Sequence, residues 1–549
     1  MGRLASLLSV PCVALMAVYA PSVRAQNASN GSLPEPPAAA ACRESASEAD
    51  LPAEPLAKAL RLYRAGDFDA ATESYRTLIA AGTDPAAAYA GLARVYLREK
   101  SVDDAFAAAS KAIDLAPTLP AANVAMGEVY FRQGELQKAE RAFLVTVRAC
   151  QADARAYYGL GRVYRVTSNY RRARIAIEKA HSLDPDDPDI REAWMETLPR
   201  AERVKYLKDY LASNAASGDE ERENLEAALA LLQDDADGPA NACRLISDVS
   251  STESKLDMLL YDPTHVRGYG LKVLLNGTPA NLLLDTGSSG ILVDRRVAEK
   301  AHIKPLVEHE ARGVGDAAPP SGYIGYVDAI KVGGLEFRGC RVEVVERTSV
   351  ADSDGLIGGD VFSHFLVELN FPDAKFKLTP LPPVPEEPGE QAALESRASE
   401  TVHLHDRYIA PEMESYLRVF RFGHALLIPT RLNGSVTKLF LIDTGAFDDT
   451  VSPRAAKEVT KISPDGQTHV HGLNGSVKQV YRANKVTLQF GHFEQKREDL
   501  ITFDLTSMSD GFGTEISGTL GFAMLQLLDI RIDYRDGLVD FRYDPNRFH

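Results

Sequence analysis

The sequence predicts a multidomain protein in which an all-α solenoid precedes a mostly β part made of two similar lobes. The first observation is the length of 549 residues, 45% of them hydrophobic and 25% charged, which is globular in composition and too long for one domain. The second is a helical pattern that recurs every 34 residues between about 55 and 188. The third is a strand–turn–strand pattern, ending in Asp-Thr-Gly, that occurs twice after residue 254.

Charge and hydropathy exclude two classes of function. Lys and Arg total 61 against 77 Asp and Glu, a formal net charge of −16. This balance argues against a nucleic-acid partner, because phosphates require basic surfaces. Mean hydropathy is −0.19, and beyond the first 25 residues no apolar run is long enough to cross a bilayer. We therefore expect no nucleic acid and no membrane span beyond that segment.

The first 25 residues have the pattern of a secretory signal peptide. Arg3 precedes an apolar stretch, and Val23 and Ala25 lie at the −3 and −1 positions of a cleavage site after Ala25. An uncleaved anchor is the alternative, but the apolar stretch is short and contains Pro11. Residues 26–54, rich in Ala, Pro, Ser and Glu, are expected to form a flexible tether. The protein is expected to be exported and to be periplasmic or extracellular.

The cysteines and histidines predict disulfides rather than a metal site. Cleavage after Ala25 leaves four cysteines, which allow three pairings among which the sequence does not choose: Cys42, Cys150, Cys243 and Cys340. They lack the spacing of a zinc site. Two His-x-His pairs, at 403–405 and 469–471, lack a third ligand. We expect neither a metal nor another cofactor.

Small and aromatic residues define the helical repeat. Leu92, Ala93, Tyr96 and Ala105 recur as Met126, Gly127, Tyr130 and Ala139, and again as Leu160, Gly161, Tyr164 and Ala173. Small residues let two antiparallel helices approach closely, while large ones such as Phe143 fill the space between neighbouring pairs. The pattern resembles the tetratricopeptide repeat, with about four copies over residues 55–188. Residues 189–253 are expected to provide capping helices and a linker.

The array has two interpretations, which the sequence leaves open. Its concave surface could hold a peptide or a protein partner, as such arrays do. It could equally be a spacer or a dimerisation arm without a ligand of its own.

The mostly β part contains the same series of elements twice. Strands expected at 270–275 and 280–284 flank Asn276-Gly277 and run into Asp285-Thr286-Gly287. Strands expected at 425–431 and 438–442 flank Asn433-Gly434 and run into Asp443-Thr444-Gly445. Further along each copy lie Leu356-Ile357-Gly358 and Thr519-Leu520-Gly521. Two homologous lobes, at 254–380 and 403–549, are expected on either side of a proline-rich linker at 381–402.

Each lobe resembles the aspartic peptidase family, especially its compact retropepsin-like lobe. The resemblance implies that Asp285 and Asp443 form the catalytic dyad. It also implies support for the two loops from Thr286 and Thr444, which would cross-link them, and from glycines that permit close approach: Gly287, Gly445, Gly358 and Gly521. Thr519 departs from the family pattern, which has an aliphatic residue there.

The chemistry explains why such a site needs two acids. Hydrolysis of an amide without a metal or a covalent nucleophile requires one group to take a proton from water and another to donate one. Two carboxyls held close together cannot both ionise, so one acid and one base coexist over a common pH range. Since each lobe supplies one aspartate, two lobes must face each other.

Flaps over the cleft are expected at 313–325 and 472–478, which are glycine-rich and flanked by strands. Tyr323, Tyr326 and Tyr481 could contact substrate there, although packed or outward-facing tyrosines are the simpler interpretation.

The sequence thus predicts an exported aspartic endopeptidase that acts on a protein or peptide substrate and uses the array to recruit it or another partner. One alternative pairs identical lobes between two chains, with Asp285 facing Asp285 and Asp443 facing Asp443. Another is an inactive scaffold that keeps the protease-like fold and binds peptides.

Overall fold

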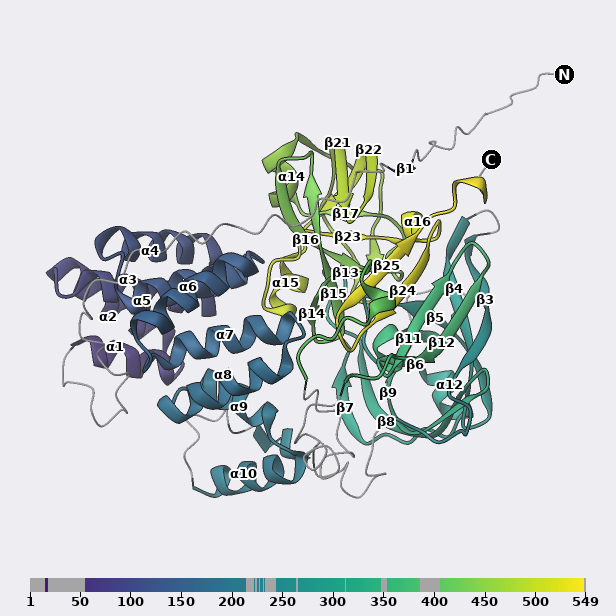
Figure 1. Ribbon diagram of the computed structural model, residues 1–549, viewed down its shortest axis with the longest axis horizontal. Helices are drawn as coiled ribbons and strands as arrows, with labels where there is room; N and C mark the ends of the chain where they lie inside the picture. The colour runs from purple at the N-terminus through teal and green to yellow at the C-terminus, as the bar shows by residue number, and fades with distance from the viewer. Residues whose placement is uncertain are drawn as a thin grey trace.

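The computed structural model describes residues 15–17, 55–213, 243–262, 265–311, 313–346, 353–385 and 405–547, with several positions between 222 and 232. Except for β1 (Leu15–Ala17), the predicted signal peptide and tether lie outside the described residues, as do Cys42 and most of the predicted linker at 381–402. The helical part, in purple and blue, lies beside the β part, in teal to yellow (Figure 1).

Paired antiparallel helices form the N-terminal array, as the 34-residue period predicts. The pairs are α1 (Pro55–Arg64) with α2 (Phe68–Ala81), α3 (Pro85–Arg98) with α4 (Val102–Leu115), α5 (Pro120–Arg132) with α6 (Leu136–Ala149), and α7 (Ala154–Val166) with α8 (Tyr170–Leu183). Gly127 has the predicted role, because a Cβ on it would lie 2.6 Å from the ring of the fully buried Phe143. In the segment predicted to cap the array, α9 (Pro188–Thr197) and α10 (Arg200–Ala212) follow.

The first lobe is built on a sheet that also extends into the second. In chain order its elements are β2 (Arg244–Leu245), β3 (Thr252–Asp262), β4 (His265–Leu275), β5 (Thr278–Asp285), β6 (Ile291–Asp294), α12 (Arg295–Lys300), β7 (Val307–Glu310), β8 (Ser321–Val332), β9 (Leu335–Val345), β10 (Gly355–Gly358), β11 (Phe365–Asn370) and β12 (Lys375–Pro380). The short strand β2 lies in the segment predicted as a linker and pairs with β9. The sequence did not predict it, because two residues are too few to show a periodic pattern.

The second lobe repeats this plan. Its elements are β13 (Leu417–Arg418), β14 (Phe420–Phe422), β15 (Ala425–Leu432), β16 (Val436–Ile442), β17 (Thr450–Val451), α14 (Pro453–Val459), β18 (Ile462–Pro464), β19 (His471–Gly472), β20 (Gly475–Ser476), β21 (Val480–Phe490), β22 (Phe493–Phe503), α15 (Thr506–Phe512), β23 (Gly518–Leu520), α16 (Phe522–Leu525), β24 (Asp529–Asp533) and β25 (Leu538–Arg542). Antiparallel pairing of β11 with β24 joins the lobes into one sheet.

Matched hairpins lead into both Asp-Thr-Gly loops. Asn276 and Gly277 turn β4 into β5 with φ of 48° and 83°, and Asn433 and Gly434 turn β15 into β16 with φ of 47° and 67°. Two consecutive positive φ angles suit the right-handed twist of a hairpin, and Asn-Gly adopts them at little cost. Both predicted hairpins are therefore present, and each delivers its strand to the centre of the β part.

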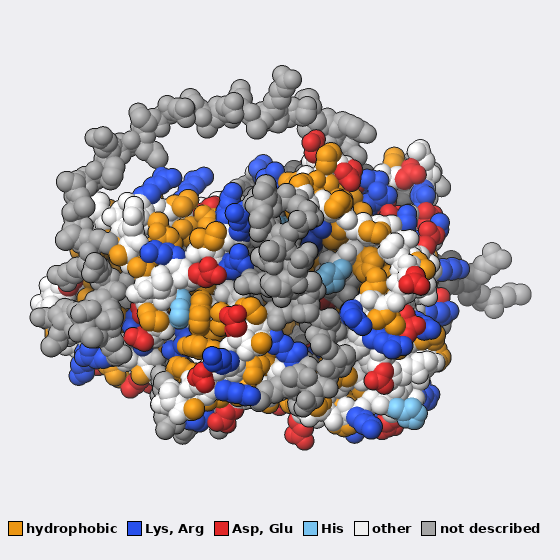
Figure 2. All heavy atoms as spheres, turned by 60° about the horizontal axis from the view of Figure 1, so that its bottom comes forward, with side chains coloured by type: hydrophobic (Ala, Val, Ile, Leu, Met, Phe, Trp, Pro, Cys, Tyr) orange, Lys and Arg blue, Asp and Glu red, His pale blue; other side chains and the backbone are white. Residues whose placement is uncertain are grey.

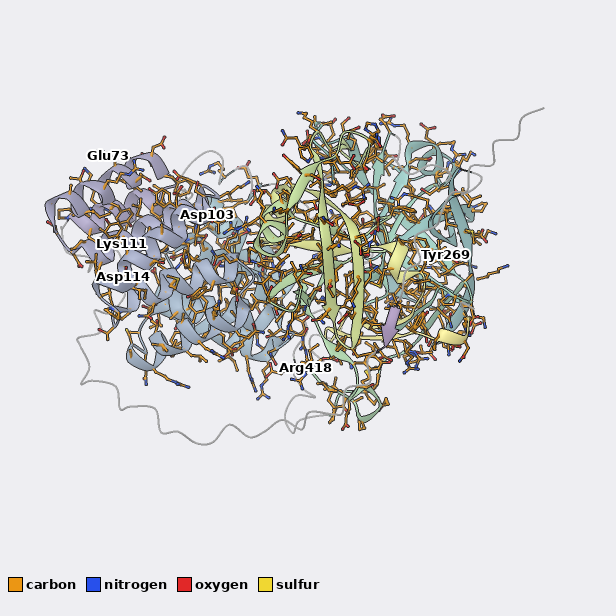
Figure 3. The ribbon with its side chains drawn as sticks, turned by 90° about the horizontal axis from the view of Figure 1, so that it is seen from above. Glu73, Asp103, Lys111, Asp114, Tyr269 and Arg418 are labelled. Atoms are coloured by element: carbon orange, nitrogen blue, oxygen red, sulfur yellow. A yellow bond between two sulfur atoms is a disulfide. The ribbon has the colours of Figure 1, made fainter. Side chains whose placement is uncertain are left out.

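The array packs directly against the second lobe. Phe131 lies 5.9 Å from Phe422 between ring centroids, and its carbonyl accepts a hydrogen bond of 2.9 Å from the Thr514 hydroxyl. One apolar cluster contains buried residues from both parts: Val124, Phe131, Leu136, Ala139, Phe143, Ala156, Leu160, Val163, Val166 and Ala176 with Phe422, Ala425, Leu427, Leu439, Leu441, Phe503, Leu505 and Ile516. Asp103, which pairs with Arg454 at 2.6 Å, lies on the side of the array facing this lobe, whereas Glu73 and Asp114 lie farther away (Figure 3).

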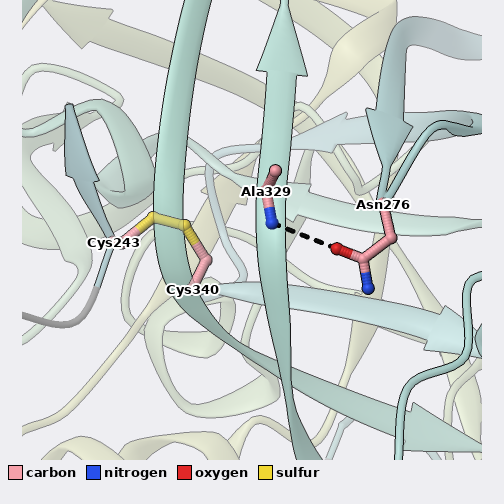
Figure 4. The surroundings of a disulfide bond; sticks show 4 residues. All are labelled: Cys243, Asn276, Ala329 and Cys340. Atoms are coloured by element: carbon pink, nitrogen blue, oxygen red, sulfur yellow. Dashed lines mark hydrogen bonds between the residues drawn. A yellow bond between two sulfur atoms is a disulfide. The ribbon is translucent and has the colours of Figure 1, made fainter. Parts of the chain in front are cut away.

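A disulfide links the start of the first lobe covalently to its sheet. Cys243, just before β2, is bonded to Cys340 on β9, across a sequence separation of 97 residues (Figure 4). Nearby, Asn276 accepts a hydrogen bond of 3.0 Å from the Ala329 N–H, which ties the β4–β5 turn to β8. Cys150 at the end of α6 is also disulfide-bonded.

On the face shown in Figure 2, Lys and Arg side chains are interspersed with Asp and Glu side chains. Within the described residues, every helix is too short or too polar to cross a bilayer.

Candidate active site

Asp285 and Asp443 meet at the centre of the β part. Asp285 is the last residue of β5, beside Gly358 of the parallel strand β10. Asp443 directly follows β16, and its N–H donates a hydrogen bond of 3.0 Å to Leu520 of the parallel strand β23. In both lobes a strand from later in the chain is inserted beside the acid-bearing strand. The structure therefore brings the two predicted acids together within one chain.

Reciprocal hydrogen bonds of the two threonines lock the loops together. The Thr286 hydroxyl donates to the Ile442 carbonyl at 2.8 Å and accepts from the Thr444 N–H at 3.1 Å. The Thr444 hydroxyl donates to the Leu284 carbonyl at 2.8 Å and accepts from the Thr286 N–H at 3.0 Å. Both threonines are 1% exposed, so these four bonds form without competition from water. The predicted cross-link is present and fixes the separation of the acids.

Close packing explains the glycine after each threonine. A Cβ on Gly287 would lie 2.6 Å from the carboxyl carbon of Asp443, closer than atoms can approach. A Cβ on Gly445 would likewise overlap the carboxyl group of Asp285. Each acid thus rests on the glycine of the opposite loop. Any side chain at either position would push the carboxyl groups apart.

Hydrogen bonds hold the two carboxyl groups unequally. Asp285 accepts from the Gly287 N–H at 2.9 Å through Oδ1 and from the Ser288 hydroxyl at 2.7 Å through Oδ2. Asp443 accepts from the N–H groups of Gly445 and Ala446 at 2.9 Å, both through Oδ1. The second lobe has alanine where the first has Ser288, so only Asp285 has a hydroxyl donor on its second oxygen.

Burial and the charge of Asp285 favour the protonated form of Asp443. Burial raises the pKa of Asp443 to about 7, and the charge of Asp285 and a side-chain hydrogen bond between the two acids act in the same direction. The loop N–H groups oppose this rise without cancelling it. Below about pH 7 Asp443 is therefore protonated.

Two further acids, which the sequence reasoning missed, tie the active-site loops to the segments at the inserted strands. Asp360, just after Gly358, accepts a hydrogen bond of 3.0 Å from the Gly290 N–H. In the second lobe Asp449 accepts one of 2.8 Å from the Gly521 N–H and pairs with Arg497 at 3.1 Å. Burial raises the pKa of Asp449 to about 6, against the opposing charge of Arg497. The acidic pair Asp448-Asp449 follows Asp-Thr-Gly closely in the sequence, and this position could have indicated its role in supporting the loop.

Thr519, which departs from the family pattern, is accommodated by a partner. Its hydroxyl lies 2.8 Å from that of Thr450 on β17, and both side chains are buried. A hydrogen-bonded pair of hydroxyls costs little to bury, unlike a single one. The second loop is thus supported at this position as well.

Both predicted flap regions contribute to a bridge between the lobes. Asn474 donates its N–H to the Val314 carbonyl at 2.9 Å, and its side-chain oxygen accepts from the Gly313 N–H at 3.0 Å. Asp316 accepts from the Lys478 N–H at 2.7 Å. Residues 313–317 and 471–478, hereafter the flap tips, are therefore joined from opposite lobes.

The tyrosines near the flaps are partly engaged elsewhere. Tyr323 is 8% exposed and donates its hydroxyl to the Ile303 carbonyl at 3.3 Å, so it packs in the first lobe rather than facing a substrate. The Tyr481 hydroxyl contacts the Gln479 side chain at 3.1 Å. Tyr326 is half-buried on β8.

The histidine pairs have other partners. His471 lies 2.9 Å from the Ser476 hydroxyl and 6.4 Å from His469 between ring centroids. His405 lies 3.7 Å from Asp536, and His403 lies outside the described residues. Nowhere among the described residues do three His, Cys, Asp or Glu side chains cluster as metal ligands would.

Ion pairs connect the inner helices of the array, α1, α3, α5, α7 and α9. Arg155 on α7 contacts Glu128 on α5 and Asp187 at the start of α9, both at 3.0 Å. Arg64 on α1 pairs with Asp184, just after α8, across the array. These ion pairs of buried acids tie repeats that are far apart in the sequence to one another.

Two facing lobes with cross-linked Asp-Thr-Gly loops define the β part as aspartic-protease-like. A family model described as aspartyl protease matches residues 271–361 and 428–523, and a tetratricopeptide repeat model matches 56–120 and 124–188. The chain therefore combines a protease-like part with a tetratricopeptide repeat array.

A similar solved structure is that of a thermophilic tetratricopeptide repeat protein from Thermus thermophilus. It is 22% identical over 33% of this chain and 97% of that chain, with a TM-score of 0.27. No curated protein matches the sequence.

Proposed function

We propose that the protein is an exported aspartic endopeptidase that hydrolyses peptide bonds in protein substrates. The observation that carries the proposal is the pair of hydrogen-bonded carboxyl groups, Asp285 and Asp443, on cross-linked loops of one chain. A dyad built within one chain has no need of a second copy, which favours the intramolecular arrangement over pairing between two chains.

The geometry suggests a division of roles between the acids. Asp285, with Ser288 and Gly287 donating to its two oxygens, is suited to remain charged and to take a proton from a water molecule held between the acids. The water oxygen then attacks the peptide carbonyl carbon, and Asp443 gives its proton to the carbonyl oxygen. When the C–N bond breaks, the proton held by Asp285 passes to the departing amine, and Asp443 takes back a proton from one of the two hydroxyl groups as the carbonyl forms again. Atoms and charges balance without a cofactor.

The arrangement of the flap tips is evidence in favour of a polymeric substrate. Because hydrogen bonds join them from opposite lobes, an extended chain would be enclosed after the tips separate and rejoin. An extended peptide also supplies backbone N–H and C=O groups that such strands can bind. This arrangement favours cleavage within a chain over attack on a small molecule.

Export is supported by the chemistry of the cysteines. The bonds at Cys243–Cys340 and at Cys150 would persist in an oxidising compartment and are rare in the cytosol. Together with the signal-peptide pattern of the first 25 residues, they support a periplasmic or extracellular location. The tetratricopeptide repeat array is proposed to recruit a protein, either the substrate or a further partner.

The test is cleavage of a denatured protein by the full chain and by two single variants. We expect cleavage that a pepstatin-like inhibitor blocks, and its loss in both Asp285→Asn and Asp443→Asn, because each acid has its own role. kcat/KM should fall as pH rises through about 7, since Asp443 then loses the proton it must donate.

Sedimentation of the active species provides the control for chain pairing. A monomer whose specific activity is independent of concentration fits one dyad per chain. A folded wild-type protein without cleavage anywhere between about pH 3 and about pH 9 would favour the inactive peptide-binding scaffold. Activity retained in either single variant would contradict the proposed dyad.

A further inference from the structure

An arginine lies beside the dyad but donates none of the hydrogen bonds that hold the two carboxyl groups. Arg267 is on β4, the strand that pairs with β5 and so runs next to the one carrying Asp285. Its neighbour Gly268 sits between the lobes, because a Cβ there would lie 2.6 Å from Leu283 of the first lobe and 4.0 Å from the Thr444 carbonyl of the second. This part of β4 therefore lies against both loops.

The guanidinium group of Arg267 is partly buried and incompletely paired. Burial lowers the pKa of Arg267, while the charges of Asp285 and Asp443 oppose that change, so the group lies within electrostatic reach of both acids. Its Nη1 is shielded from solvent and has no hydrogen-bond partner among the described residues. A buried N–H group without an acceptor is unfavourable unless a ligand supplies one.

Other arginines near the dyad are used differently. Arg497 forms ion pairs with Asp448 and Asp449 and supports the second loop. Arg421 donates to the carbonyl groups of Gly423 and Tyr534. These two are anchored to the fold, whereas Nη1 of Arg267 has no acceptor among the described residues.

The acceptor that fits a guanidinium group best is a carboxylate, which can accept two parallel hydrogen bonds. Neither dyad acid fills this role, because Nη1 of Arg267 has no hydrogen-bond partner among the described residues. We infer that Arg267 determines specificity by binding a carboxylate of the peptide substrate next to the scissile bond. This inference rests on the proposed function, because only a peptidase has a scissile bond. The binding of the carboxylate can nevertheless be measured without cleavage.

Such a carboxylate has two sources, an Asp or Glu side chain or the substrate's C-terminus. Both offer the same chemistry to Arg267. They differ in where the substrate would be cut: anywhere along a chain in the first case, and only near its end in the second. The probes must therefore separate a side chain from a terminus.

The experiment measures peptide binding to the full-length Asp443→Asn protein, which should bind substrates without cutting them. The probes are hexapeptide libraries, N-acetylated and C-amidated, with Glu or Gln fixed at each position in turn, and the same libraries with a free C-terminus. We expect at least about tenfold tighter binding for Glu than for Gln at one position, or for the free over the amidated terminus. The first result assigns a side chain, the second a terminus.

Variants of Arg267 in the same background identify the binding group. Arg267→Gln should remove the preference while leaving the affinity for neutral peptides unchanged, which also shows that the variant folds. Arg267→Lys should keep only part of it, because an ammonium group lacks the planar fork. Arg338→Gln, an exposed arginine on β9, is the matched control and should change nothing.

Two outcomes would overturn the inference: equal affinity for acidic and neutral peptides, or a preference that survives Arg267→Gln. Failure of the proposed function looks different, since wild-type protein would then bind acidic peptides through Arg267 and leave them intact. Cleavage without any acidic preference would contradict the inference alone.

Discussion

At the scale of single residues, the site is symmetric in its loops and asymmetric in its charge. Thr286 and Thr444 exchange equivalent hydrogen bonds, and each glycine supports the opposite acid. Only the first loop has a serine, whose hydroxyl donates to Asp285, while Ala446 occupies the equivalent place in the second. A single oxygen atom thus distinguishes the hydrogen bonding of the two acids.

Replacing Ser288 should test that assignment. In Ser288→Ala the charged form of Asp285 loses a donor worth about 1.5–3 kcal/mol. Because each 1.4 kcal/mol changes a rate about tenfold, kcat/KM should fall by about 10- to 100-fold. The acidic limb of the pH–rate profile should also move to higher pH. Steady-state kinetics on one peptide over the pH range provide the measurement.

Ser288→Thr is the matched control for this change. It retains a hydroxyl group and should keep most of the activity and the original acidic limb. A profile for Ser288→Ala that is superimposable on the wild type would contradict the assigned roles.

At the scale of elements, the flap tips join the two lobes by hydrogen bonds between them. Residues 313–317 follow β7, and residues 471–478 include β19 and β20. Hydrogen bonds at Asn474 and Asp316 join them. Exposed polar bonds of this kind contribute little net stability each, so the tips are suited to separate and rejoin.

Asn474→Ala should loosen this bridge. The variant loses the acceptor for the Gly313 N–H but keeps the main-chain bond to Val314. We expect faster amide hydrogen exchange at 313–317 and 471–478, a KM changed severalfold, and a Tm close to that of the wild type, because the bond adds only about 1 kcal/mol.

Gln467→Ala, an exposed change on the same lobe, serves as the control and should leave the exchange of both tips unaltered. If amide hydrogen exchange at the flap tips is the same in Asn474→Ala as in the wild type, the Asn474 side chain does not hold the bridge.

At the scale of the whole molecule, the array and the second lobe share one apolar cluster. Phe131 contributes to it from the end of α5 and is 3% exposed, and a Cβ on Gly134 would lie 3.0 Å from Leu439 of the lobe. An interface of this kind resembles a domain core more than a transient contact. We therefore expect the array and the lobe to unfold together.

The single tryptophan makes this prediction measurable. Trp194 lies on α9, so its fluorescence reports on the array, while cleavage reports on the protease-like part. Both signals should be lost in one transition. Phe131→Ala should lower the unfolding free energy by about 3–5 kcal/mol for both signals, because it opens a cavity in the shared cluster.

Phe106→Ala, a phenylalanine on α4 that is 41% exposed, should have little effect on either signal. Two separate transitions in the wild type, or a loss confined to the fluorescence signal of Phe131→Ala, would show that the array and the lobe are independent units.

The elements and both acid-bearing loops were predictable because their signals are local. A 34-residue period, an Asn-Gly turn or an Asp-Thr-Gly loop acts over a few residues or one repeat, so the array, the hairpins and the positions of Asp285 and Asp443 followed from the chain alone. Contacts between distant segments carry no such signal. Four features depend on how complete sheets and helices pack: the Cys243–Cys340 bond, the ion pair of Asp449 with Arg497, the packing of Phe131 on Phe422 and the place of Arg267 beside the dyad. Only the folded molecule brings these residues within reach of one another, because burial and hydrogen bonding across such distances form with the core as a whole.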